Sequence, residues 1–156
     1  MKKLSFAHLY FAESDLHITD VLTSVGVSVK LGSGNSKTEI HWCYGFNALG
    51  GSKENLDCTP LVATHKMNKS GLEDREPWEL EYYFNETDKA TLDALVTSGA
   101  QGTEADIEIT WPNGGKDTNK GVVTGNYIQD VQVNGMLTAK ATVDLSGSWS
   151  HTAPSP

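Results

Sequence analysis

The stretch from Trp78 to Leu145 constrains the fold most, because its apolar residues recur with two different periods. Over Trp78–Tyr82, apolar residues alternate with polar ones, which predicts a strand with Trp78, Leu80 and Tyr82 on its core face. Similar alternation recurs after residue 105, while the stretch between has the three-to-four-residue period of a helix. The pattern predicts a mainly β fold, an antiparallel β-sandwich or barrel flanked by one α-helix.

The helix is predicted between residues 85 and 99. Asn85 or Thr87 can accept hydrogen bonds from the first unpaired amides, and Gly99 can end the helix. One face carries an apolar stripe with helical spacing, formed by Leu92, Leu95 and Val96. We therefore expect about three turns packed by one face on a sheet.

Turn-forming residues between alternating segments predict three hairpins. They join residues 25–31 to a strand through Ile40 and Trp42 by way of 32–35, residues 106–111 to 121–125 by way of 112–115, and residues 127–133 to 136–145 by way of Asn134-Gly135. The predicted sandwich domain therefore spans residues 25–147.

The remaining segments lack such patterns. Residues 44–77 are rich in turn formers and charges, and only Leu56–Ala63 looks extended, so we predict a long loop that contacts a partner. Residues 1–24 could form an arm, a short helix or an edge strand. Residues 148–156 have no core pattern and are expected to be a flexible tail.

The chain is acidic, with 12 Lys and Arg against 20 Asp and Glu and a net charge of −8. Residues 1–76 hold 8 basic and 9 acidic side chains, net −1, whereas residues 77–156 hold 4 and 11, net −7. Such a balance argues against a groove that neutralises phosphates. It fits either a solvated acidic surface or one that repels DNA.

Two carboxylate pairs, Glu79/Glu81 and Asp106/Glu108, do not form a catalytic constellation. A glycosidase needs two carboxyl groups that face each other across a cleft. Residues two apart on a strand instead point to the same side, outward in this pattern. We predict no catalytic residues and no enzymatic activity.

The cysteines and histidines show no metal-binding spacing. Cys43 and Cys58 lie 15 residues apart without a Cys-x-x-Cys pair, and no His-Glu-x-x-His pattern occurs. We expect free, buried thiols, with no metal site and no cofactor. No apolar run is long enough to span a membrane, so no membrane partner is predicted.

Several segments, in order, resemble the major tail tube proteins of long-tailed, siphovirus-like bacteriophages. The resemblance covers roughly residues 25–148 and is carried by Leu49–Leu61, Gly71–Asp74 before Trp78–Glu81, Ile107–Gly115, Asp117 with Gly121–Thr124, the Gly135 hairpin, and Thr142–Gly147. It implies a sandwich whose copies form rings, with six per ring, that stack into a hollow tube. DNA would pass through this tube without specific binding.

The same resemblance implies a location and partners. The protein would lie in the virion tail after assembly in the host cytoplasm, and would contact itself and the tape-measure, tail-tip and tail-terminator proteins. The segment before residue 25 and the tail after Gly147 would serve as further contact arms.

Site residues follow from the resemblance as well. Residues 44–76 would reach a neighbouring ring, with candidate contacts at Leu49, Glu54, Leu56, Asp57, Leu61, Lys66, Lys69, Leu72 and Asp74. The candidates for the lumen wall are Glu79, Glu81, Asp106 and Glu108. Removal of residues 45–75 should then leave the sandwich folded but block polymerisation.

Two alternatives stay open. The chain could be the tube protein of a secretion or bacteriocin-like contractile machine. From another class, it could be a monomeric β-sandwich that binds carbohydrate through exposed Trp42, Trp78 or Trp149. The alternation argues against the latter, because it places Trp78 and Trp111 in the core.

Overall fold

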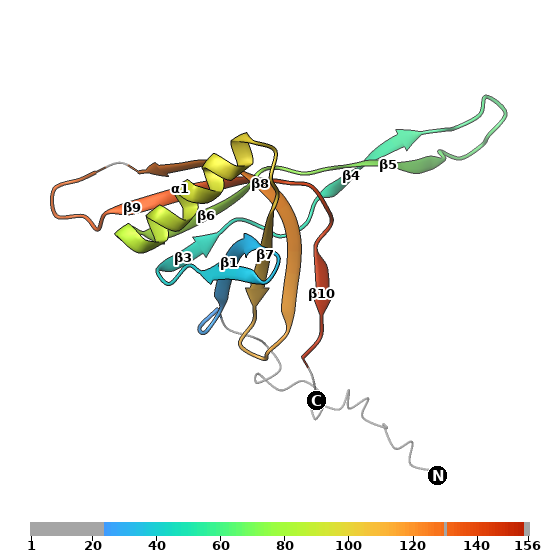
Figure 1. The fold of residues 1–156 in the computed structure, drawn as a ribbon. Coiled ribbons are helices and arrows are strands. Elements are labelled where there is room, and N and C mark those ends of the chain that lie inside the picture. Colours follow the sequence, from blue (N-terminus) through green and yellow to red (C-terminus); the bar gives the residue numbers. More distant parts are fainter. Residues whose placement is uncertain (1–23, 130, 155–156) are drawn as a thin grey trace, which may run out of the picture.

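The computed structural model describes residues 24–129 and 131–154. Along this part of the chain, six strands precede a single helix and four follow it (Figure 1). The elements are β1 (Ser28–Ser33), β2 (Ser36–Glu39), β3 (Cys43–Phe46), β4 (Ser52–Asp57), β5 (Asn68–Asp74), β6 (Trp78–Tyr83), α1 (Glu86–Ala100), β7 (Ala105–Thr110), β8 (Lys116–Ile128), β9 (Thr138–Leu145) and β10 (Ser150–Thr152). The predicted class, mainly antiparallel β with one flanking helix, is confirmed.

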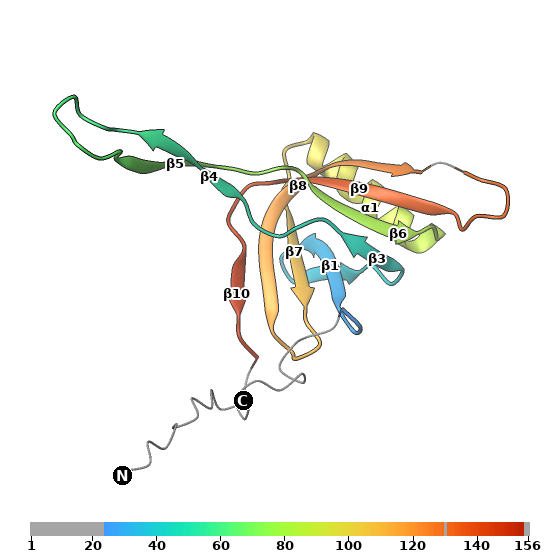
Figure 2. The ribbon, with the colours of Figure 1, turned by 180° about the vertical axis from the view of Figure 1, so that it is seen from behind.

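Eight strands form one antiparallel sheet that folds over on itself (Figure 2). The order is β2-β1-β7-β8-β9-β6-β3, and β10 pairs with β8 off this path. The long strand β8 belongs to both layers, because its first part pairs with β7 and β10 and its later part with β9. A register shift between Val123 and Gly125 marks the irregularity in this strand, as expected where a strand bends.

The core lies between the layers and consists of the inward residues of the alternating strands. Trp78, Leu80 and Tyr82 are almost completely buried, as the alternation of β6 predicts. Facing strands contribute Val29, Leu31, Ile107, Ile109, Ala139, Ala141 and Val143. Burial of this set supplies the main driving force for folding the body of the molecule.

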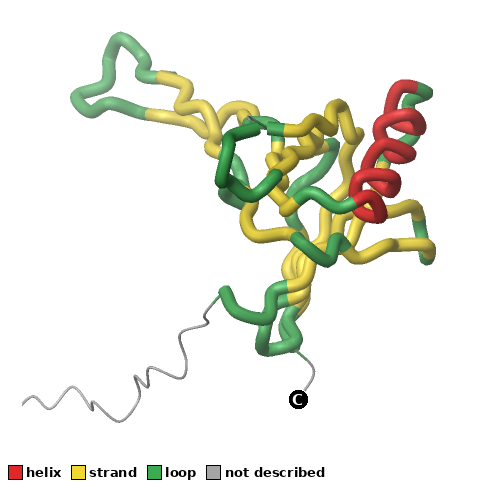
Figure 3. The backbone as a smooth tube through the Cα atoms, turned by 90° about the vertical axis from the view of Figure 1, so that its left-hand side faces the viewer, coloured by secondary structure: helices red, strands yellow, loops and turns green. Residues whose placement is uncertain are grey.

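Helix α1 packs along β8 and lies on the flank of the strands (Figure 3). The Asn85 side chain caps it by accepting a hydrogen bond from the Asp88 amide at 2.8 Å. The helix ends in a Schellman motif, with Gly102 at φ +80° and the Thr103 amide bonded to the Ser98 carbonyl. Gly99 is therefore not the terminating residue.

Gly99 has a different role from the predicted one. A Cβ at this position would lie 2.6 Å from the Val123 carbonyl oxygen, so the glycine permits close contact between helix and strand. Leu92, from the predicted stripe, is fully buried, and Leu95 and Val96 pack against the core.

Two boundaries in the second half differ from the prediction. Segments 121–125 and 127–133 belong largely to one strand, β8, which runs from Lys116 to Ile128. The hairpin to β9 is present, but its connection is longer than the two residues Asn134-Gly135. Asn134 has φ +68°, and the Gly135 amide donates to the Gln132 carbonyl in a tight turn within this connection.

The irregular segments are more structured than predicted. The long loop over 44–77 contains the end of β3 and the hairpin β4–β5, and Leu56–Ala63 is extended only as far as Asp57. The tail 148–156 carries β10, so the expectation of a flexible end is wrong there. Trp149 anchors this segment by packing edge-on against Trp78, with ring centroids 5.8 Å apart. The prediction for residues 1–24 falls, except for Ser24, outside the described residues.

Candidate assembly surfaces

The hairpin β4–β5 projects away from the body (Figure 1). It forms a separate two-stranded sheet, and all six residues of β4 are exposed. Apolar side chains lie open on it, with Leu61, Val62 and Leu72 all at least 87% exposed. An isolated two-stranded hairpin with bare apolar side chains is only marginally stable in water.

Most of the predicted contact residues lie on this hairpin. Leu49 is the exception, because it precedes β4 and packs against the core of the body. The others lie on β4, on β5 or on the connection between these strands, and are Glu54, Leu56, Asp57, Leu61, Lys66, Lys69, Leu72 and Asp74. The structure thus brings together eight residues that the sequence analysis placed in one loop.

The far end of the hairpin is organised by a small hydrogen-bond network. The Thr59 hydroxyl donates to Asp57 Oδ1 at 2.6 Å, and the Met67 amide donates to the same hydroxyl oxygen at 2.8 Å. The bonds from the Thr59 hydroxyl and amide hold the pKa of Asp57 below its usual value. These contacts keep residues 57–67 in a defined turn although they are exposed.

Arg75 attaches the base of the hairpin to the C-terminal segment. Its guanidinium donates to both carboxylate oxygens of Glu73, at 2.9 and 2.8 Å, and so lowers the pKa of that carboxyl. It also donates to the Gly147 carbonyl and, at 2.8 Å, to the Ser148 hydroxyl. This bond network, which we call the Arg75 clamp, links the hairpin to the segment that leads into β10.

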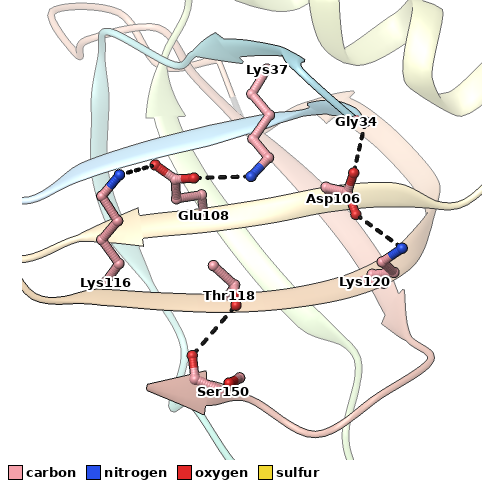
Figure 4. Close-up of polar contacts among 8 residues, drawn as sticks. All are labelled: Gly34, Lys37, Asp106, Glu108, Lys116, Thr118, Lys120 and Ser150. Atoms are coloured by element: carbon pink, nitrogen blue, oxygen red, sulfur yellow. Dashed lines mark hydrogen bonds and ion pairs between the residues drawn. The ribbon is translucent and has the colours of Figure 1, made fainter. Parts of the chain in front are cut away.

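The outer surface of β2, β1, β7, β8 and β10, which we call the polar face, carries two of the predicted lumen residues (Figure 4). Glu108 accepts hydrogen bonds from Lys37 at 2.9 Å and Lys116 at 3.1 Å, and these lysines lower its pKa. Asp106 accepts from the Gly34 amide at 2.7 Å and lies 3.5 Å from Lys120. Both carboxylates are therefore neutralised by neighbouring lysines.

The strand registers show the balance of charge on the polar face. The outward positions of these strands hold four lysines and three carboxylates, namely Lys30, Lys37, Lys116, Lys120, Glu39, Asp106 and Glu108. The face is close to neutral although the chain as a whole has a net charge of −8. It is not the acidic wall that the charge count of residues 77–156 suggested.

The other two predicted lumen residues lie on the other layer. Glu79 is 2.6 Å from Lys140, and this carboxylate raises the lysine pKa. Glu81 accepts a hydrogen bond from the Gln129 side chain at 3.4 Å. The two predicted pairs thus come from different layers and do not converge on one surface of the monomer.

Three strands of the eight-stranded sheet have an edge without a strand partner in the part of the chain described. β2 and β3 end the sheet path, and β10 pairs along one side with β8. Unpaired edges present free backbone amides and carbonyls that can pair with another chain. They are candidate contacts between copies.

Sequence reasoning missed an apolar surface at the end of the body remote from the hairpin β4–β5. We call it the aromatic end; it consists of Trp42, Tyr44, Tyr83, Tyr127, Ile128 and Leu137, with Val131, Val133 and Met136 in the adjoining connection, all of them exposed. Tyr44 and Tyr83 are in contact, with ring centroids 4.6 Å apart. The sequence did carry a sign of this surface. In residues 127–133, apolar residues occupy both odd and even positions, so they cannot all face one core.

Reactive groups do not converge elsewhere in the described part. Residues 24–129 and 131–154 contain no group of three or more His, Cys, Asp or Glu side chains that could hold a metal ion. Both cysteines are free, but Cys58 is exposed, contrary to the prediction, and Cys43 is half-buried. α1 is neither long nor apolar enough to cross a membrane.

No protein-family model matches this sequence, and no curated protein matches it either. Solved structures do. A chain from the sheath/tube terminator of PVC, an extracellular contractile injection system, in its extended state has a TM-score of 0.66 at 11% identity, covering 85% of this chain and 97% of that one. A chain from the PVC sheath-tube complex has a TM-score of 0.65 at 12% identity, with 91% and 98% covered.

A third similar chain comes from the tail of an empty GTA particle with C6 symmetry. It has a TM-score of 0.60 at 18% identity and covers 88% of this chain and 99% of that one. These identities are low, so what is shared is the fold. The chain has a tail-tube-like fold, found in chains from a contractile injection system and from the tail of a GTA particle.

Proposed function

We propose that this protein is a structural subunit of a tail tube, assembled from copies of itself into stacked rings around a channel. The observation that carries the proposal is the near end-to-end match with tube and tail chains, which leaves little of either chain unmatched. The projecting hairpin supports it, because that hairpin exposes apolar side chains that a monomer would gain nothing by presenting to water.

Ring closure follows from the unpaired strands. If β2, β3 or β10 of one copy pairs with a strand of the next, closure around a ring leaves no free edge. Six copies are the proposed number, because the similar GTA tail has C6 symmetry. The ends of such a tube would contact tape-measure, tail-tip and tail-terminator proteins, and the tube would form part of a virion tail assembled in the host cytoplasm.

The polar face is the proposed wall of the channel. The exposed large apolar side chains of residues 24–129 and 131–154 lie elsewhere, so assembly would cover those surfaces and leave this face in water. Three of its four lysines are engaged by Glu108 and Asp106, which limits their attraction for phosphates. DNA would slide past without specific binding.

The particle type is a finer question. The sequence resembles tube proteins of long-tailed phages, whereas two of the similar structures belong to a contractile injection system. We propose a phage tail tube, with the tube of a contractile machine as the alternative. Neighbouring genes distinguish them, because a sheath gene would indicate the contractile machine, and a tape-measure and terminase gene without a sheath gene would indicate a long non-contractile tail.

A carbohydrate-binding module has weaker support. Of the three tryptophans that such a module would use, Trp78 is buried and Trp149 packs against it, which leaves Trp42 exposed. The proposed subunit is also non-catalytic, in keeping with its carboxylates being tied to lysines on strand faces.

Electron microscopy of the purified protein over a concentration series tests the proposal. We expect hollow rings or tubes at high concentration. The variant compared with the full chain has residues 52–74 replaced by a short turn. Removal of the whole segment 45–75 would also delete Gly45 and Phe46 of β3 and Arg75, whereas replacement of 52–74 keeps β3 and the bonds from Arg75 to Gly147 and Ser148. This variant should keep the far-ultraviolet spectrum of a folded sandwich and lose stacking, whereas persistent monomers of the full chain would overturn the proposal.

A further inference from the structure

The exposed apolar side chains of the described residues gather, apart from Val25, in two places at opposite ends of the molecule. One is the hairpin β4–β5, with Leu56, Leu61, Val62, Met67 and Leu72, and the other is the aromatic end. Figure 2 shows β4–β5 and the β8–β9 connection pointing in opposite directions from the body. Two different apolar surfaces on opposite ends suit a head-to-tail contact between copies.

Charged side chains border both surfaces. The connection between β4 and β5, with the first residues of β5, carries Lys66, Lys69 and His65 and no carboxylate between residues 58 and 69. The aromatic end is bordered by Glu81, beside Tyr44, and by Glu86 at the start of α1. Lys66 lies 3.6 Å from Asp57 at the end of β4, whereas Lys69 can attract the carboxylates that border the aromatic end.

The aromatic end also has a shallow depression in its surface. An open hollow of about 470 Å³ lies there, lined by Tyr127, Ile128, Gln129 and Thr138. Tyr44 and Tyr83 form an adjoining aromatic pair. Aromatic residues at the centre of a contact are the side chains that most often dominate its binding energy.

We propose that the hairpin β4–β5 of one copy docks on the aromatic end of a copy in the neighbouring ring, with Leu61 and Val62 against Tyr127 and Ile128. This rests on the proposed function and adds the receiving surface for the hairpin. The contact is heterologous, so each copy gives a hairpin and receives one. Stacking then continues until one of the two surfaces is left without a partner.

Complementation between two variants tests the contact. The hairpin variant carries Leu61→Glu and Val62→Glu, and the end variant carries Tyr127→Glu and Ile128→Glu; all four positions are exposed, so both chains should fold. Each variant alone should stop at unstacked rings or monomers, with self-association weaker by on the order of 100-fold or more. An equal mixture should form assemblies joined in pairs, because one surface of each kind is intact.

Sedimentation velocity and electron microscopy read out the pairs, and circular dichroism checks the fold. Ala94→Glu, which adds a charge at an exposed position of α1, is the matched control and should stack like the unaltered chain. Stacking by either double variant alone, or no pairing in the mixture, overturns the proposed contact. A thermal shift with soluble glycans that is lost in the end variant would assign the aromatic end to carbohydrate and also overturn it.

A cross-link gives an independent measurement. Cys58 lies next to the exposed connection of the hairpin, and Val133 lies in the connection at the aromatic end. A chain with Val133→Cys and Cys58→Ser, mixed with the unaltered chain, should form an intermolecular disulfide under mild oxidation when assembled. Tubes from the unaltered chain without this cross-link and without complementation would refute the docking alone, whereas absence of any rings or tubes would refute the proposed function itself.

Discussion

The body and the hairpin β4–β5 use apolar residues in opposite ways. In the body, Leu31, Leu80 and Ile107 are at 0% exposure, and β6 and β7, which carry the last two, alternate between buried and more exposed positions. In the hairpin, the side chains of Leu61, Val62 and Leu72 are exposed to solvent, as is every residue of β4. The body is stabilised by its own core, whereas the hairpin has no core of its own and is attached at its base.

This difference indicates which part of the chain needs another molecule to bury its apolar side chains. Burial of a leucine side chain contributes roughly 1.5–3 kcal/mol, which the body gains on folding and the hairpin does not. The hairpin would gain a similar contribution only when another surface covers it. Stability of the monomer and the capacity to assemble should therefore depend on separate sets of residues.

The largest effect should separate the two regions directly. Leu80→Ala, in the middle of β6, should lower the free energy of unfolding by about 2–5 kcal/mol, because it leaves a cavity in a closely packed core. Leu72→Ala, on the hairpin, should change it by about 0.5 kcal/mol or less. Urea denaturation of the monomer measures both, and equal losses for the two variants would refute the division.

A smaller effect is expected where the two regions are joined. Arg75→Ala removes the clamp to Glu73, Gly147 and Ser148, so the hairpin and the β10 segment should move more freely. Unfolding free energy should fall by less than for Leu80→Ala, since what is lost is a charge-assisted contact at the surface and not core packing. Hydrogen exchange should quicken in β5 and β10 and stay unchanged in β6. Arg75→Lys should not restore the protection from exchange, because a lysine ammonium cannot make the two parallel hydrogen bonds to Glu73 that the planar guanidinium makes.

On the polar face, the expected effect is smaller still and depends on pH. Lys37 and Lys116 depress the pKa of Glu108, so this ion pairing stabilises the fold above the ordinary glutamate pKa, near 4.3, and is lost as the pH falls through the lowered value. Glu108→Gln should cost less than about 1 kcal/mol at pH 7, because the lysines are partly exposed. The cost should shrink as the pH falls through that lowered pKa; thermal melts of both chains from neutral to acidic pH would show a constant difference if the pairing were irrelevant.

The reaction rates of the two cysteines measure the same difference between the body and the hairpin without a mutation. Burial raises the pKa of the Cys43 thiol to about 11, whereas Cys58 is exposed beside the hairpin connection. A thiol reagent at pH 8 should therefore modify Cys58 rapidly and Cys43 only when the body unfolds. Equal reaction rates would show that the body opens as readily as the hairpin.

What the sequence predicted well is the body, because its strands have one buried and one solvated side. Trp78, Leu80 and Tyr82 carry that alternation, and Asn85 marks the start of the helix as a capping residue should. The hairpin was missed as a hairpin because β4 is exposed on both sides and shows no alternation. β10 was missed because its three residues are exposed and show no alternation.

The candidate site was predictable only in part. Residues 44–77 stood out as the segment for partner contact, but strand alternation could not show that Glu79/Glu81 and Asp106/Glu108 lie on different layers. That information is in the strand order, which depends on contacts distant in sequence. The aromatic end arises in the same way, since Trp42, Tyr83 and Tyr127 become neighbours only when β3, β6, β9 and β8 pair.

Hydrogen exchange of the hairpin amides in monomer and in assembled protein tests the central claim most directly. The account predicts weak protection of residues 52–74 in the monomer, strong protection in rings or tubes, and little change in the core strands β6 and β7. A hairpin already protected in the monomer, or one that stays unprotected after assembly, would contradict it.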